Sequence, residues 1–106
     1  MSESLTDRER GFERKYELDQ ELEFKIKARG DKLVAQWAAV QLGLSGPAAE
    51  AYVQAAVASG FERPGGLTAK IVQDLKDSGH EASAADIARR LEVCRAAASQ
   101  QLKPAR

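Results

Sequence analysis

Residues 33–47 read LVAQWAAVQLGLSGP, a stretch whose large apolar side chains recur with the period of an α-helix. These side chains are Leu33, Trp37, Val40 and Leu44. Their spacings of four, three and four residues place them on one helical face. We expect this face to be buried, with Trp37 anchoring the core. The Ser45-Gly46-Pro47 run should end the helix and begin the next, because a proline lacks only an N–H that the first helical turn leaves unpaired.

Three more helices are expected after this break, separated by glycine and proline. The second should run from Pro47 to the Arg63-Pro64-Gly65-Gly66 cluster. The third carries the apolar residues Leu67, Ile71, Val72 and Leu75. The fourth should begin at Ser83, because Asp86 three residues later completes a capping box. Its apolar face consists of Ala84, Ile87, Ala88, Leu91, Cys94, Ala98 and Leu102.

The first helix should start well before residue 33. Leu18, Leu22 and Ile26 are spaced by four residues and extend the same stripe, which predicts a helix over 19–42. Gly30 interrupts this helix at a cost of about 1 kcal/mol relative to alanine. No segment alternates apolar and polar residues, so we expect no strands. The predicted fold class is all-α, a four-helix bundle formed by residues 19–106 with a long first helix.

Residues 1–18 should behave differently, as a flexible N-terminal arm. Their large apolar residues are Leu5, Phe12, Tyr16 and Leu18. So few apolar groups cannot offset the entropy lost when eighteen residues become ordered. The segment is also close to the length at which isolated helices are marginal in water. We therefore expect an arm that is disordered or a fraying helix when free, and that folds on a partner.

The overall composition excludes several classes of protein. Lysine and arginine number 16 and aspartate and glutamate 16, a balance that argues against a nucleic-acid binder. One cysteine allows no internal disulfide, which favours a reducing compartment. The chain starts with neither a basic segment nor an apolar run, so we expect no secretory signal. No apolar stretch approaches the roughly 20 residues that would cross a bilayer. These features predict a cytoplasmic protein that does not insert into a membrane.

The residues that commonly carry catalysis are poorly placed for it. His80, the one histidine, falls in a glycine-flanked turn and should be exposed. Cys94 lies on an apolar stripe, where a structural thiol is more usual than a nucleophile. Gly65-Gly66 is too short to indicate a phosphate-binding loop. We therefore expect no enzyme activity, no cofactor and no metal site.

The most distinctive segment is DRERGFERKY at residues 7–16. Glu9 and Glu13, like Arg10 and Arg14, are like charges four residues apart, which mildly destabilises an isolated helix. A partner that compensates both charges would explain this pattern, with Phe12 and Tyr16 as anchors in a helix-in-groove complex. A plain solvated extension fits the residues equally well.

The same segment resembles the N-terminal signature of the zeta subunit family of alphaproteobacterial ATP synthases, Asp-Arg-Glu-x-x-Phe-Glu-x-Lys. The resemblance is specific over residues 7–52 and generic afterwards. It continues through Phe24-Lys25, Ala28-Arg29, Lys32-Leu33, Trp37-Ala38-Ala39, Leu42-Gly43 and Ala49-Glu50-Ala51-Tyr52. Gly11 and Gly30 depart from the pattern, since helix-favouring or larger residues are expected there, and both should loosen the free helix.

The resemblance implies a regulatory subunit that binds the F1 sector of the ATP synthase, formed by its alpha, beta and gamma subunits. It implies inhibition of ATP hydrolysis by insertion of the N-terminal segment at a catalytic interface, and a location peripheral to the inner membrane. The free chain should be a monomer. The partner-binding residues implied are Asp7, Arg8, Glu9, Arg10, Phe12, Glu13, Lys15 and Tyr16.

Two other functions remain open from the residues alone. One is a helical adaptor with an unrelated protein partner. The other is a module that senses a small ligand or nucleotide in a pocket between the bundle helices.

Overall fold

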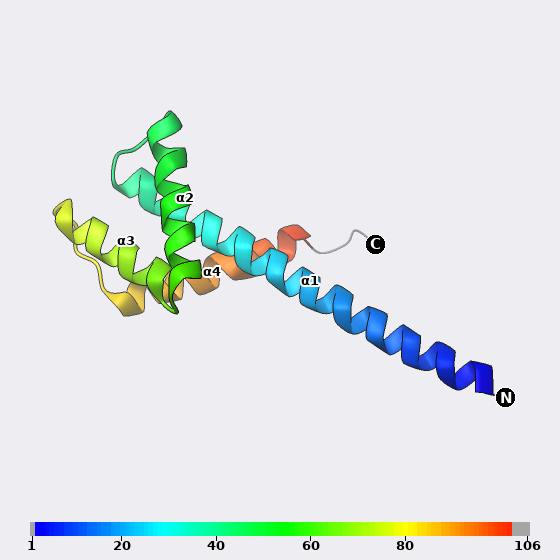
Figure 1. Cartoon of the computed structure of the whole chain (residues 1–106). Coiled ribbons are helices and arrows are strands. Elements are labelled where there is room, and N and C mark those ends of the chain that lie inside the picture. The colour runs from blue at the N-terminus through cyan, green and yellow to red at the C-terminus, as the bar shows by residue number, and fades with distance from the viewer. Residues whose placement is uncertain (1, 103–106) are drawn as a thin grey trace.

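The computed structural model describes the backbone of residues 2–102 and the side chains of residues 19–102. Four helices make up this part of the chain (Figure 1). They are α1 (Ser2–Gln41), α2 (Gly46–Glu62), α3 (Gly66–Asp77) and α4 (Ala84–Leu102). Within residues 2–102 there is no strand. The predicted fold class, an all-α four-helix bundle with a long first helix, is confirmed.

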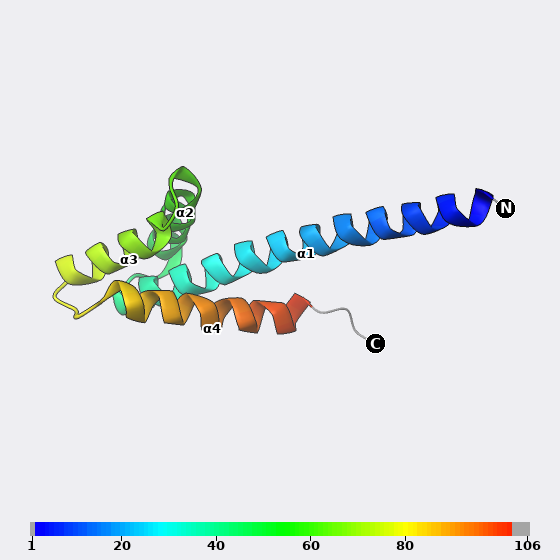
Figure 2. The same ribbon diagram turned by 90° about the horizontal axis from the view of Figure 1, so that it is seen from below.

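Helix α1 extends far beyond the bundle. It begins at Ser2, and not near residue 19 as predicted, so the arm takes the helical one of the two forms expected for it. The N-terminal half of α1 projects away from the other three helices (Figure 2). The radius of gyration of 18.3 Å therefore exceeds the value of about 13 Å typical of a compact chain of this length. The longest dimension of the molecule is 69 Å, most of which is this one helix.

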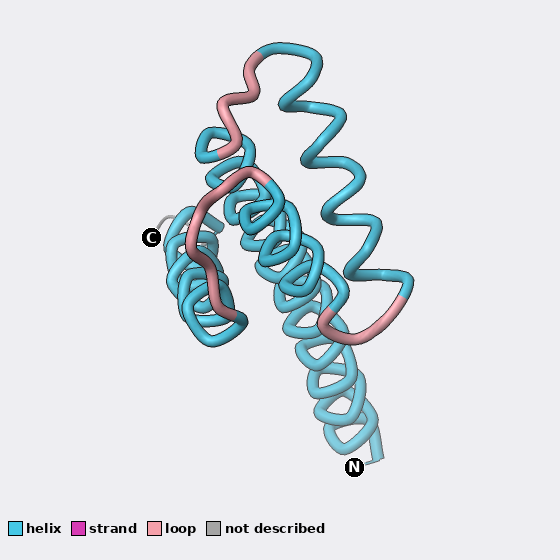
Figure 3. The backbone as a smooth tube through the Cα atoms, turned by 90° about the vertical axis from the view of Figure 1, so that its left-hand side faces the viewer, coloured by secondary structure: helices cyan, strands magenta, loops and turns pink. Residues whose placement is uncertain are grey.

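The other three helices pack around the C-terminal half of α1. Seen from the end of the bundle in Figure 3, α2 and α4 lie on either side of α1. Helix α3 packs against α2 and also contacts α1 and α4. The predicted association of three shorter helices with the C-terminal half of the first is therefore correct.

Helix boundaries follow the expected signals. The Asp86 N–H donates to Ser83 Oγ over 3.1 Å, as the predicted cap of α4 requires. Pro47 lies in the first turn of α2. Helix α3 ends at Asp77, and the φ of 85° at Gly79 lets the His80 N–H donate to the Leu75 carbonyl over 2.9 Å.

The core combines small side chains on α1 and α2 with leucine and isoleucine side chains on α3 and α4. Its buried members are Val34, Ala35, Ala38, Ala56, Leu67, Ile71, Leu75 and Ile87. The buried face of α1 differs from the predicted one. Val40, expected in the core, is 69% exposed, whereas the alanines beside it are buried. The reason is that α1 contacts all three other helices, and alanine lets helix backbones approach closely. Trp37 packs against this core, as predicted.

Candidate functional site

The residues predicted to bind a partner all lie on the projecting part of α1. They are Asp7, Arg8, Glu9, Arg10, Phe12, Glu13, Lys15 and Tyr16. Their side chains lie outside the described residues, so their individual roles stay predictions. The backbone shows how they are presented: they belong to one continuous helix with the bundle residues of α1.

The arm leaves the bundle where α4 ends. Arg29 Nε donates to Gln101 Oε1 over 3.0 Å, one residue before the end of α4 at Leu102. From Arg29 back to Ser2, α1 continues for about 40 Å at the rise of an α-helix. We call the contact region at this point the arm base. It comprises Lys27, Arg29, Gly30 and Asp31 on α1, with Arg95 and Gln101 on α4.

Gly30 brings the two helices of the arm base into backbone contact. It is buried, and a Cβ atom added to it would lie 2.5 Å from Arg95 Cγ and 2.9 Å from Arg95 Cα. No side chain fits in that space. Sequence reasoning assigned this glycine only a weakening effect on the helix, and missed its role in letting α4 approach α1.

Asp31 is the second feature of the arm base that sequence reasoning missed. Its side chain is buried, with Oδ2 3.3 Å from Lys27 Nζ and Oδ1 3.3 Å from Arg95 Nη2. It is the one charged residue among those described that is buried. The sequence signal was weak, because Asp31 shares a helical face with Val34 and Ala38, and side chains this small mark a buried face poorly. The Arg95–Asp31 ion pair joins α4 to α1, and together with the close packing at Gly30 it opposes rotation of one helix against the other.

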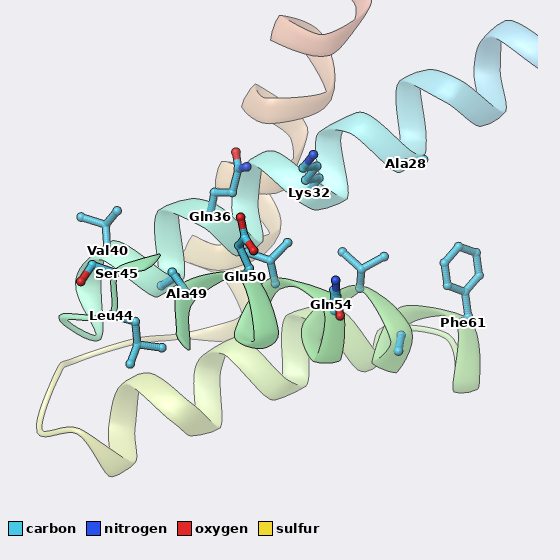
Figure 4. Close-up of a pocket in the computed structure, with 14 residues that line it drawn as sticks. Ala28, Lys32, Gln36, Val40, Leu44, Ser45, Ala49, Glu50, Gln54 and Phe61 are labelled. Carbon is cyan, nitrogen blue, oxygen red and sulfur yellow. The ribbon is translucent and has the colours of Figure 1, made fainter. Parts of the chain in front are cut away.

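A groove runs between α1 and α2 on the bundle itself. Its volume is about 1000 Å³. Figure 4 shows Val40 and Leu44 at one end, and Ala28 and Phe61 at the other. The Phe61 ring centroid is 5.4 Å from Lys27 Nζ, so this second end of the groove lies beside the arm base.

A smaller cleft of about 520 Å³ lies beside Trp37, between α3 and α4. The Arg90 guanidinium covers one face of the Trp37 ring, 4.0 Å from its centre. A cation stacked on the indole supports the reading of Trp37 as a structural residue.

His80 and Cys94 are the two side chains that the sequence analysis considered as candidate catalytic groups. His80 is exposed, as predicted. Cys94 is half-buried, and burial raises the pKa of its thiol while the charge of Arg90 offsets part of the effect. Less thiolate at neutral pH suits a structural cysteine. Burial also raises the pKa of the Tyr52 phenol, and the nearby Asp74 carboxylate raises it further.

The described residues contain neither a metal-binding cluster nor a membrane-spanning helix. No group of three or more histidine, cysteine, aspartate or glutamate side chains there could hold a metal ion. No helix there is long and apolar enough to cross a membrane.

Comparison with known proteins adds one result to this geometry. A family model described as ATPase inhibitor subunit zeta matches residues 1–101 of the chain. The matched range includes the whole arm, α1 to α3 and nearly all of α4. It agrees with the resemblance seen in residues 7–52 and extends beyond it. No curated protein matches the chain.

Proposed function

Because the chain belongs to the ATPase inhibitor subunit zeta family, we propose that it binds the F1 sector of the ATP synthase and blocks ATP hydrolysis with its N-terminal arm. The family gives the general role, inhibition of an ATPase by a subunit. The observation that supports the finer proposal is the form of α1, a single helix that projects beyond the last contact with α4.

In the proposed mechanism, the arm occupies a catalytic interface and prevents it from closing. A rotary ATPase opens and closes its catalytic interfaces in turn, and a helix lodged in one interface would stop the next closure. Residues 2–18 span about 26 Å as a helix, enough to enter such an interface while the bundle stays outside. Phe12 and Tyr16 would be the buried anchors. The surrounding charged residues, from Asp7 to Lys15, would set the register.

The arm base would make this insertion efficient. Gly30 and Asp31 fix α1 against α4, so the arm leaves the bundle in one direction. A helix that is already aligned loses less conformational entropy on binding than a free segment does. The bundle would also keep the arm at a high local concentration once it docks.

The family match supports this function over the two alternatives, an adaptor for an unrelated partner and a ligand-sensing module. We propose that the chain is a regulatory protein and not an enzyme, a monomer when free, and a binder of the alpha, beta and gamma subunits. It would be cytoplasmic and reach the inner membrane only through the ATP synthase.

The test is ATP hydrolysis by the purified F1 sector, with the full chain and with a chain lacking residues 1–18. The shortened chain should keep its fold, because every buried residue described lies at Gly30 or later. Circular dichroism of both proteins checks this. We expect the full chain to inhibit and the shortened one to leave hydrolysis unchanged. Equal inhibition by both would assign the activity to the bundle and refute the proposed role of the arm.

A further inference from the structure

Four large hydrophobic side chains in the described part of the chain are strongly exposed, and three of them gather on one side of the bundle. Val40 and Phe61 line the α1–α2 groove and are 69% and 63% exposed. Phe24 is 59% exposed and precedes Ala28, which also lines the groove, by one helical turn. The fourth, Val93, is on α4.

We propose that the α1–α2 groove is a second contact surface for the ATPase, and that it receives an amphipathic helix of a partner subunit. This inference rests on the proposed function and extends it from the arm to the bundle. The arm would block catalysis, and the groove would hold the bundle in place.

The groove has the dimensions of a helix site. Along α1 it extends from Ala28 to Val40, which corresponds to about 18 Å or about three helical turns. Valines and alanines form much of its lining, so a helix can approach closely. The apolar lining residues are Ala28, Ala39, Val40, Leu44, Ala49, Val53, Val57, Ala58 and Phe61. This pattern matches recognition of a helix through an apolar stripe.

No described part of the chain covers this surface. Helix α4 packs on a different side of α1 from α2 (Figure 3). Its contact with α1 includes Arg95 against Gly30. The arm points away from the bundle (Figure 2). Phe24 and Ala28 lie one helical turn apart on α1, and Ala28 lines the end of the groove nearest the arm. Lys27 stacks on Phe61 at this end of the groove. The arm and the groove are therefore continuous along α1, and one partner could contact both.

The charges of the groove define its occupant further. Lys32 of α1 and Glu50 of α2 both line it and are exposed. Neither forms an ion pair with any residue in the described range, whereas Lys25, Lys27 and Lys70 each do. A partner helix with an acidic residue facing Lys32 and a basic residue facing Glu50 would complement both. The occupant is thus amphipathic, with one charge of each sign beside its apolar stripe.

The shape of the groove argues against a symmetric pair of two copies of this chain. A two-fold interface would place the same concave surface on both sides. The two apolar linings would then face each other across a gap. A convex helix fills the groove from a single side.

The experiment measures the dissociation constant of the full chain for purified F1 by biolayer interferometry. Val40→Asp places a charge in the groove, and Val93→Asp is the matched control, with a similar exposure of 64% on α4. We expect Val40→Asp to raise the dissociation constant at least tenfold and Val93→Asp less than twofold.

A second pair of variants tests the charge of the groove. Glu50→Lys should raise the dissociation constant at least fivefold, and Glu92→Lys on α4 less than twofold. All four substituted residues are exposed, so the melting temperature of each variant should differ little from that of the wild type.

The inference and the proposed function fail in different ways. If Val40→Asp and Glu50→Lys bind F1 like the wild type, and the wild type inhibits through its arm, the groove inference is wrong and the proposed function stands. A wild-type chain that forms a dimer which Val40→Asp dissociates would also overturn the inference, since a second copy would then occupy the groove. A wild-type chain that does not bind F1 refutes the proposed function itself.

Discussion

At the scale of single residues, Gly30 shows how a residue that weakens a helix can strengthen a bundle. In a helix interior glycine costs about 1 kcal/mol relative to alanine. Here the missing Cβ lets the backbone of α4 approach at Arg95. The same approach brings the Arg95 guanidinium to the buried Asp31. Gly30 therefore lowers the intrinsic stability of α1 but allows the close packing of α4 against α1.

Substitution of Gly30 by alanine tests this packing. The added Cβ would lie 2.5 Å from Arg95 Cγ, so we expect Gly30→Ala to lower the free energy of unfolding by about 1–3 kcal/mol, as overpacking does. Chemical denaturation measures the effect. Gly60→Ala is the matched control, because a Cβ there would meet Leu67 Cβ at an ordinary 3.4 Å. This control should be neutral or stabilising by up to about 1 kcal/mol. A Gly30→Ala chain as stable as the wild type would show that α4 can shift freely at this point.

At the scale of helices, the sequence predicted the C-terminal elements better than the buried face of α1. Leu67, Ile71 and Leu75 are buried in α3 as expected, because their large side chains carry the helical period plainly. In α1 the spacing of the large apolar residues predicted the wrong buried face. The deeply buried positions are mostly alanines, whose small apolar area gives a weak periodic signal, and Val40 faces solvent.

The proposed function depends on the arm, and Gly11 is the residue of the arm with the lowest helix propensity. Gly11→Ala should favour the helical arm by about 1 kcal/mol. If the arm binds as a helix, the half-inhibitory concentration for F1 should fall by up to about fivefold, since 1.4 kcal/mol corresponds to tenfold. Circular dichroism of the free chain should show more helix at the same time. Greater helicity with weaker inhibition would mean that the arm binds in another conformation.

At the scale of the whole molecule, the proposals assign inhibition to the projecting arm and docking to the bundle. The predicted partner-binding residues came from the resemblance of residues 7–16 to a known family, because the charges and aromatics alone also fit a solvated extension. The arm base and the groove could not be predicted in the same way. Arg95 is 64 residues from Asp31, and Phe61 is brought beside Lys27 only by the packing of α2. Such contacts depend on the arrangement of the helices and not on local sequence.

The measurement that tests the central claim most directly is site-specific photo-crosslinking of the full chain to F1. A photoreactive phenylalanine analogue replaces Phe12 in one protein and Val93, exposed on α4, in a control. We expect the analogue at position 12 to crosslink to alpha, beta or gamma peptides that border a catalytic interface, and the analogue at position 93 to give no crosslink to those peptides. A position-12 protein that inhibits ATP hydrolysis fully but forms no crosslink at a catalytic interface would contradict insertion of the arm.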